Sequence, residues 1–198
     1  MHAHADVDGT RRDLIGSLVG VNLGSVQLRP VEESDLDFLY RFDLEPGLIG
    51  PNWYGFRDAA RQRRRFETDG WLGEEDGKLM VAVDGQVAGF VGWSACGHGA
   101  GRYRAIGVVL LPECRGRGVG TQAQNLLCRY LFTHTAVHRI EAGTQPENEA
   151  EQRVLQKIGF CREGVLRGAE FRDGSWRNAV KVRRLGRPGW VRVVRCGG

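Results

Sequence analysis

The chain is 198 residues long, with 41% apolar and 26% charged residues, values typical of one soluble globular domain. No run approaches the roughly 18 consecutive apolar residues that a membrane-spanning helix needs, so no membrane partner is expected. The net charge of +4 comes almost wholly from arginine, which suits an anionic small ligand as well as a nucleic acid.

The two ends of the chain are expected to lie outside the folded domain. We predict a flexible leader over residues 1–24, one domain over 25–190 and a basic tail over 191–198. No small-residue cleavage site follows the short apolar run near the N-terminus, so a cytoplasmic protein is expected. The five cysteines form no C-x-x-C pair, and Thr135 stands where a zinc-binding helix would need Glu after His134, so no metal is expected.

The first predicted elements are a strand, a helix and an aromatic loop. Residues 26–30 alternate apolar and polar side chains up to a proline, which indicates a short strand. Apolar spacing after Ser34 predicts a helix over 33–43. Residues 44–56 hold two prolines, three glycines and three aromatic residues, a loop that packs on the core or lines a site. A basic helix is expected over 57–68.

Strands dominate the next part of the chain. Residues 78–83 and 86–95 flank Asp84-Gly85, which is a strong hairpin signal. Residues 96–101 form a glycine-rich turn. Residues 103–111 are apolar enough for a central strand.

The last third of the sequence predicts one helical crossover between strands and a hairpin that ends the domain. Apolar residues at helical spacing follow Val119, a strand covers 139–144, and a helix over 148–158 ends at Gly159. Strands over 160–171 and 175–185 flank Asp173-Gly174. The elements therefore predict a mixed α/β fold with mostly antiparallel strands.

A glycine-rich turn between a strand and a helix, Arg115 to Thr121, is a candidate anion site. Free N–H groups and the helix dipole favour negative charge there, although such turns also occur only to let a helix pack closely. A P-loop would need a lysine, and none is near. A dinucleotide fingerprint needs a third glycine where Thr121 stands, and the strands before it do not fit that fold.

The remaining pattern, [Q/R]-x-x-G-x-[G/A], fits Arg115–Gly120, and the stretch 106–123 closely resembles the acetyl-CoA loop of the GNAT acetyltransferases. Residues 138–150 resemble the family's next strand and helix start. Residues 154–167, 173–177 and 28–30 resemble its RimJ/RimL branch. The resemblance spans nearly all of residues 26–190 and implies a three-layer fold, with about four helices and a twisted central sheet that splays at the CoA site.

The resemblance implies acetyl-CoA as co-substrate and a set of residues that hold it. The pantetheine arm would pair with the backbone of Val108, Val109 and Leu110. The pyrophosphate would meet the backbone and side chains of Arg115, Gly116, Arg117, Gly118, Val119, Gly120 and Thr121. Asn148 would hold the arm or simply cap its helix, and Arg153 would meet the 3′-phosphate or stay a solvated charge.

The catalytic residues depart from the family pattern. Many relatives have a carboxylate where this chain has Ala105. Glu141 is the preferred base, with a strand-edge ion pair as its alternative. Tyr103 is a second candidate acting through water, or a core side chain. Glu151 serves as the acid only if burial raises its pKa, and is otherwise a first-turn charge. The N–H of Val109 is expected to stabilise the oxyanion.

The sequence thus favours acetyl transfer to a primary amine, either a protein N-terminal α-amine or a small-molecule amine, by direct attack in a ternary complex. Two alternatives stay open: a CoA-binding module that has lost catalysis, and an acetyltransferase that modifies an antibiotic. A nucleic-acid partner rests only on the basic C-terminal segment and is not favoured, and a homodimer is compatible with the sequence.

Overall fold

The computed structural model describes residues 26–50, 53, 55–58 and 60–186. The predicted leader and the predicted tail lie outside these residues. None of the described helices has the length and apolarity to span a bilayer.

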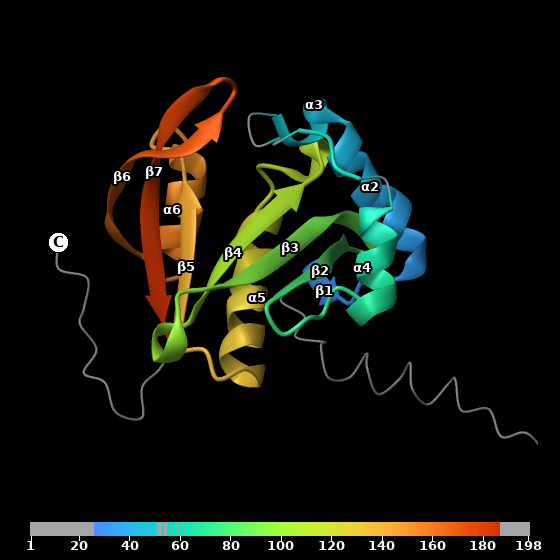
Figure 1. Ribbon diagram of the computed structural model, residues 1–198, viewed down its shortest axis with the longest axis horizontal. Coiled ribbons are helices and arrows are strands. Elements are labelled where there is room, and N and C mark those ends of the chain that lie inside the picture. Colours follow the sequence, from blue (N-terminus) through green and yellow to red (C-terminus); the bar gives the residue numbers. More distant parts are fainter. Residues whose placement is uncertain (1–25, 51–52, 54, 59, 187–198) are drawn as a thin grey trace, which may run out of the picture.

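Seven strands form one mixed sheet in the order β1-β2-β3-β4-β5-β7-β6 (Figure 1). All neighbouring strands are antiparallel except β4 and β5, which are parallel. The strands are β1 (Val26–Arg29), β2 (Asp76–Val83), β3 (Gln86–Cys96), β4 (Tyr103–Leu110), β5 (Arg139–Thr144), β6 (Cys161–Arg172) and β7 (Ser175–Leu185).

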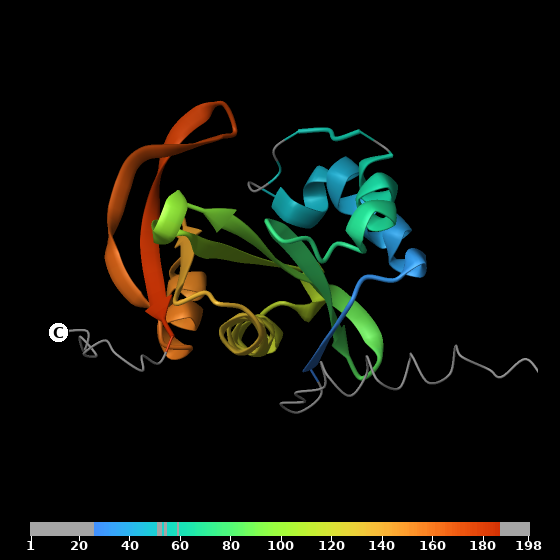
Figure 2. The same ribbon diagram turned by 60° about the horizontal axis from the view of Figure 1, so that its bottom comes forward.

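Helices cover both faces of the sheet, so the domain has three layers (Figure 2). One face carries the two helices that follow β4 and β5, α5 (Val119–His134) and α6 (Glu149–Lys157). The other face carries α2 (Leu36–Leu44), α3 (Pro46–Ile49) and α4 (Arg61–Asp69). Short 3₁₀ turns cover η1 (Glu33–Asp35), η3 (Gly99–Gly101) and η4 (Pro112–Cys114).

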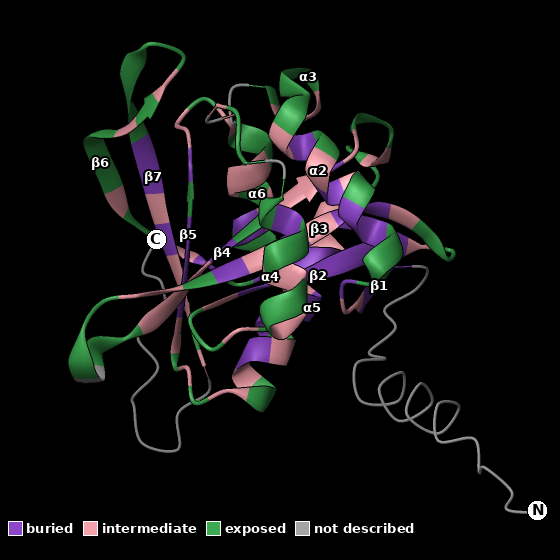
Figure 3. Cartoon of the chain, turned by 45° about the vertical axis from the view of Figure 1, so that its right-hand side comes forward, coloured by how far each residue is buried: buried purple, intermediate pink, exposed green. Residues whose placement is uncertain are grey.

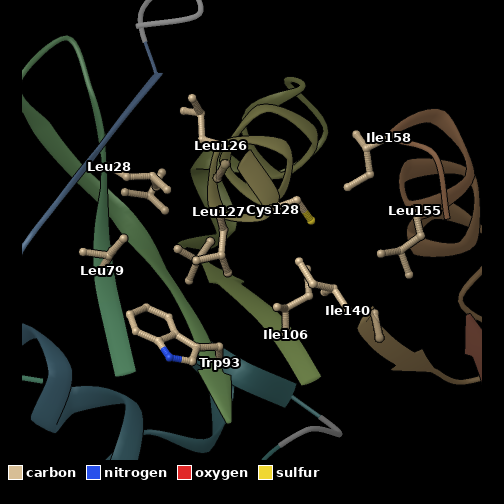
Figure 4. Close-up of a cluster of buried hydrophobic side chains, with 14 of the residues drawn as sticks. Leu28, Leu79, Trp93, Ile106, Leu126, Leu127, Cys128, Ile140, Leu155 and Ile158 are labelled. Carbon is tan, nitrogen blue, oxygen red and sulfur yellow. The ribbon is translucent and has the colours of Figure 1, made fainter. Parts of the chain in front are cut away.

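Each face of the sheet has its own apolar core. The larger core joins α5 and α6 to the sheet through fully buried side chains such as Leu127, Ile140 and Leu155 (Figure 4). The smaller core lies under α2, where Leu36 and Leu39 contact the cluster that includes Met80. The inner strand β2 is buried almost throughout, whereas the outer strand β6 is largely exposed (Figure 3).

The predicted elements are confirmed, with shifts of a few residues at their ends. Both Asp-Gly turns join hairpins, and all four of their residues have positive φ, between 48° and 81°, as the favoured two-residue turns require. The helix expected over 57–68 begins only at Arg61. The predicted aromatic loop contains the short helix α3, a fifth α-helix among the described residues where about four were expected, because Pro46 suits a first helical turn.

A buried ion pair fixes where α2 begins. Asp35 is 3% exposed and accepts two hydrogen bonds from the guanidinium of Arg29 on β1, at 2.6 and 2.8 Å. It also accepts a hydrogen bond from the N–H of Glu32 at 2.8 Å. The helix that borders the site is thereby held against the edge of the sheet.

Replacing Asp35 with Ala should lower the free energy of unfolding by roughly 2–3 kcal/mol, because the Arg29 guanidinium and the Glu32 N–H lose a charged acceptor. Urea unfolding measures this. The control is Glu33→Ala, which removes an exposed pair with Arg63 and should cost at most about 0.5 kcal/mol. Equal losses in the two variants would contradict the role given to Asp35.

Candidate active site

The main cleft lies where β4 and β5 separate. Of the described residues in these strands, only Arg104 and Ala105 pair with β5, opposite Ile140 and Glu141. Beyond Ala105 the strands diverge and leave a cleft of about 620 Å³. Its lining includes β4 from Ala105 to Val109 and β5 from Ala142 to Thr144. The predicted splay is therefore present.

The exposed edge of β4 offers unpaired peptide groups to the cleft. The N–H of Leu111 donates to the carbonyl of Ala88 at 2.9 Å, and Val109 stands opposite Phe90 on the same neighbouring strand. Because peptide groups alternate in direction along a strand, the N–H of Val109 faces β3, and those of Val108 and Leu110 face the cleft. The strand geometry therefore favours Val108 over Val109 as a donor to a ligand.

The glycine loop follows β4 after the short turn η4 and leads into α5. Gly116 and Gly118 have φ of 70° and 82°, a left-handed conformation that side chains disfavour. The N–H groups of Gly116, Arg117 and Gly118 donate to no backbone carbonyl of the described chain. The first N–H groups of α5 also lack intrahelical acceptors, so this loop is a concentrated set of free donors.

Some side chains of the loop are held by contacts within the protein, and one is exposed to solvent. The Nε of Arg115 donates to the carbonyl of Leu110 at 3.0 Å, and its Nη2 donates to the carbonyl of Leu48 on α3. Arg115 therefore ties the loop to the opposite wall. Arg117 is exposed and has no ion-pair partner among the described residues, whereas Val119 is buried in the core.

Asn148 and Glu151 line the cleft from the start of α6. The Oδ1 of Asn148 accepts from the N–H of Glu151 at 3.1 Å, so Asn148 caps the helix, and its amide nitrogen has no hydrogen-bond partner among the described residues. Burial raises the pKa of the Glu151 carboxyl, and the nearby Gln124 amide opposes that rise. A raised pKa is what a proton donor at this position needs, and Glu151 as the acid stays a prediction.

The cleft lining does not include several predicted residues: Leu110, the loop over 115–121, Glu141, Tyr103 and Arg153. Glu141 is 8% exposed, and its carboxylate pairs with Arg139 at 2.7 Å and Lys181 at 3.4 Å. Burial, followed by the charge of Glu141, raises the pKa of Tyr103. Arg153 is exposed and pairs with Glu149 at 3.1 Å. Glu141 and Arg153 thus form the ion pairs that were their alternatives, whereas Tyr103 is half-buried under Arg139 and belongs to neither apolar core. Glu141 and Tyr103 as catalytic bases stay predictions.

A second cavity was not foreseen from the sequence. It has about 240 Å³, lies on the α2–α4 side and includes Asp43, Gln62 and Lys78 in its lining. Ile49 and Phe90 belong to the lining of both this cavity and the cleft, so the two adjoin. The sequence carries two signals for it: the aromatic loop over 44–56, which supplies Ile49, Trp53 and Gly55, and Lys78, one of only three lysines.

Comparisons with known proteins agree with this geometry. Residues 25–161 match the model of the acetyltransferase (GNAT) domain. Spermidine N(1)-acetyltransferase of Escherichia coli K12 is 28% identical over 159 residues, covering 80% of this chain and 84% of that protein. The [ribosomal protein uS5]-alanine N-acetyltransferase of the same strain is 27% identical over 106 residues, 54% of each chain.

Solved structures share the fold. RimL, a ribosomal L7/L12 α-N-protein acetyltransferase in complex with CoA, superposes with a TM-score of 0.72 at 18% identity, covering 85% of this chain and 97% of that one. Mycobacterium smegmatis RimJ in complex with CoA-disulfide gives a TM-score of 0.66 at 27% identity, covering 81% of each chain. Since the matched residues 25–161 make up well over half of its length, the chain belongs to the GNAT family of N-acetyltransferases.

Proposed function

We propose that this protein moves an acetyl group from acetyl-CoA to a primary amine, with both substrates bound at once. The observation that carries this proposal is the open edge of β4 beside the glycine loop at the start of α5. The solved relatives named above hold CoA, and the E. coli relatives act on spermidine or on a ribosomal protein's alanine.

Acetyl-CoA is bound in this proposal by backbone groups and not by side-chain charge alone. The pantetheine amides pair with the cleft-facing peptide groups of Val108 and Leu110, as an added strand would. The pyrophosphate accepts from the N–H groups of residues 116–121, with Arg117 supplying positive charge. The free amide of Asn148 donates to the arm. Arg115 acts indirectly, by holding the loop in place.

The reaction proceeds by direct attack. The amine loses its proton to water in the open cleft, and its lone pair forms a bond to the thioester carbonyl carbon. N–H groups on the open edge of β4 stabilise the oxyanion. The carbon–sulfur bond then breaks, and protonated Glu151 gives its proton to the departing thiolate. The acylated nitrogen loses its second proton through water to the Glu151 carboxylate, which restores the neutral amide and the acid form of Glu151. Glu141 and Tyr103 take no part in this reaction. Glu141 pairs with Arg139 and Lys181, and Arg139 lies over the ring of Tyr103.

An acceptor screen tests the function as a whole. Purified protein with acetyl-CoA is offered peptides, diamines and amino acids, and free thiol is measured. We expect thiol release with at least one class of primary amine. Binding of CoA with no thiol release from any acceptor would favour a CoA-binding module without catalysis.

Replacing Gly118 with Val should weaken CoA binding by at least about tenfold, because the side chain strains the left-handed backbone that presents the N–H groups. Calorimetric titration with CoA measures this. Gly85 has nearly the same φ, 81° against 82°, and sits at a hairpin tip, so Gly85→Val is a matched control. An unchanged affinity in the Gly118 variant would refute the placement of the pyrophosphate.

Replacing Glu151 with Gln should lower kcat by about 100-fold and leave CoA affinity nearly unchanged, since only the proton donor is lost. In the wild type, kcat should also fall as pH rises through the raised pKa of Glu151, and this limb should be absent from the variant. Glu149→Gln, in the same helical turn but exposed and outside the cleft, is the control. A wild-type kcat in Glu151→Gln would remove Glu151 from the mechanism.

A further inference from the structure

The cavity on the α2–α4 side carries an excess of positive charge. Arg57, Arg61 and Lys78 all belong to its lining. None of the three side chains has a carboxylate within ion-pair distance among the described residues. A neighbouring arginine of the same helix, Arg63, does have one, since it pairs with Glu33 at 2.9 Å. The unpaired cations thus gather at the cavity and not along the whole basic helix.

One carboxylate, Asp43, lines the same cavity, and it is already engaged. The Nε2 of Gln62 donates to its Oδ2 at 2.6 Å. Gln62 is only 3% exposed, and its Oε1 has no hydrogen-bond partner within the part of the chain that the structure describes. A buried amide oxygen without a donor is costly, and a carboxylate cannot supply that donor, so a water or an N–H of the ligand has to donate to this oxygen.

Lys78 is the most unusual of the cations. It is 9% exposed, and its Nζ lies 4.0 Å from the ring centroid of Trp71 and 4.4 Å from that of Phe90. Lysine is almost never buried without a partner. Burial and the charge of Arg61 lower its pKa to about 7, while Asp43 and Asp76 act in the opposite direction. An anion entering the cavity would supply the partner that Lys78 lacks.

We propose that this cavity binds an anionic group of the acceptor, so that the preferred acceptor is a primary amine that also carries a carboxylate. This inference rests on the proposed acetyl transfer, because the cavity adjoins the cleft at Ile49 and Phe90. An ammonium group in the cavity would meet three cations and one carboxylate already bonded to an amide. Polyamines are therefore poor acceptors here, although a relative in E. coli acts on spermidine.

Binding of the acceptor's carboxylate is coupled to the uptake of a proton by Lys78. Burial lowers the pKa of Lys78 to about 7, and an adjacent carboxylate raises it again. The other charged groups that line the cavity or act on Lys78 are Asp43 on α2, Arg57 before α4, Arg61 on α4 and Asp76 on β2. The acceptor's carboxylate should therefore bind more tightly at pH 6 than at pH 8, with proton uptake.

The test compares ω-amino acids with diamines of the same chain length, so that the two acceptors differ only in a terminal carboxylate or ammonium group. We expect kcat/KM to be at least about tenfold higher for the amino acid, the scale of one charge-assisted contact. Tripeptides with Glu or Lys as the second residue are also compared. A preference for the Glu peptide shows that the carboxylate can be a peptide side chain and need not belong to a free amino acid. Equal or better use of diamines and lysine peptides would overturn the inference and leave the acetyl transfer intact.

Substitutions in the lining test whether the preference for a carboxylate-bearing acceptor comes from this cavity. Lys78→Met keeps the apolar contacts with Trp71 and Phe90 and removes the charge, and Arg61→Gln removes a second cation. Each should reduce the preference for the carboxylate acceptor by about tenfold, and Lys78→Met should abolish the pH dependence of its KM. Arg63→Gln, outside the cavity, should leave the preference unchanged. An unaltered preference in both cavity variants would overturn the inference.

A binding measurement separates this inference from the reaction itself. Calorimetric titration of the ω-amino acid into the wild-type protein saturated with CoA requires no turnover. Binding that weakens in Lys78→Met supports the carboxylate site even if no acceptor is acetylated, a result that would refute only the proposed function. Absence of binding in the wild type, together with acetylation of uncharged amines, would refute only the carboxylate site.

Discussion

Backbone hydrogen bonding between β4 and β5 stops after two residues of each strand, and the site depends on this interruption. Peptide groups that lose a strand partner in a partly enclosed cleft need another partner, since unsatisfied groups are costly. Water can serve, but a ligand with amides of its own matches the row of N–H and C=O groups on β4 better. The geometry of the sheet thus favours an extended amide-bearing ligand before any side chain is considered.

The helices and the loop around the cleft hold β4 and β5 apart and fix the position of the glycine loop. The helices α5 and α6 bury Leu127 and Leu155 in the larger core on one face of the sheet, which fixes the two diverging strands. Arg115 ties the loop before α5 to α3 on the other side. The loop with its free N–H groups follows the end of β4, whose residues up to Val109 line the cleft. The cationic cavity adjoins the cleft at Ile49 and Phe90, and in our proposal its charge selects between amine acceptors.

Much of the fold follows from local patterns. The Asp-Gly turns, the alternating strands and the glycine loop have conformations that their residue types demand, so the sequence predicts the elements and the backbone of the glycine loop. The roles of single charged side chains do not follow in this way, because they depend on distant partners. Glu141 meets Lys181 from β7, Arg115 meets Leu48, and Lys78 meets Trp71. Only the folded chain brings these groups together.

The most direct test of the account is a crystal structure of the protein with CoA. We expect the pantetheine arm to lie along the open edge of β4, with hydrogen bonds to Val108 and Leu110, and the pyrophosphate to lie on the N–H groups of residues 116–121. A complex in which CoA binds elsewhere and the edge of β4 stays unoccupied would contradict the account.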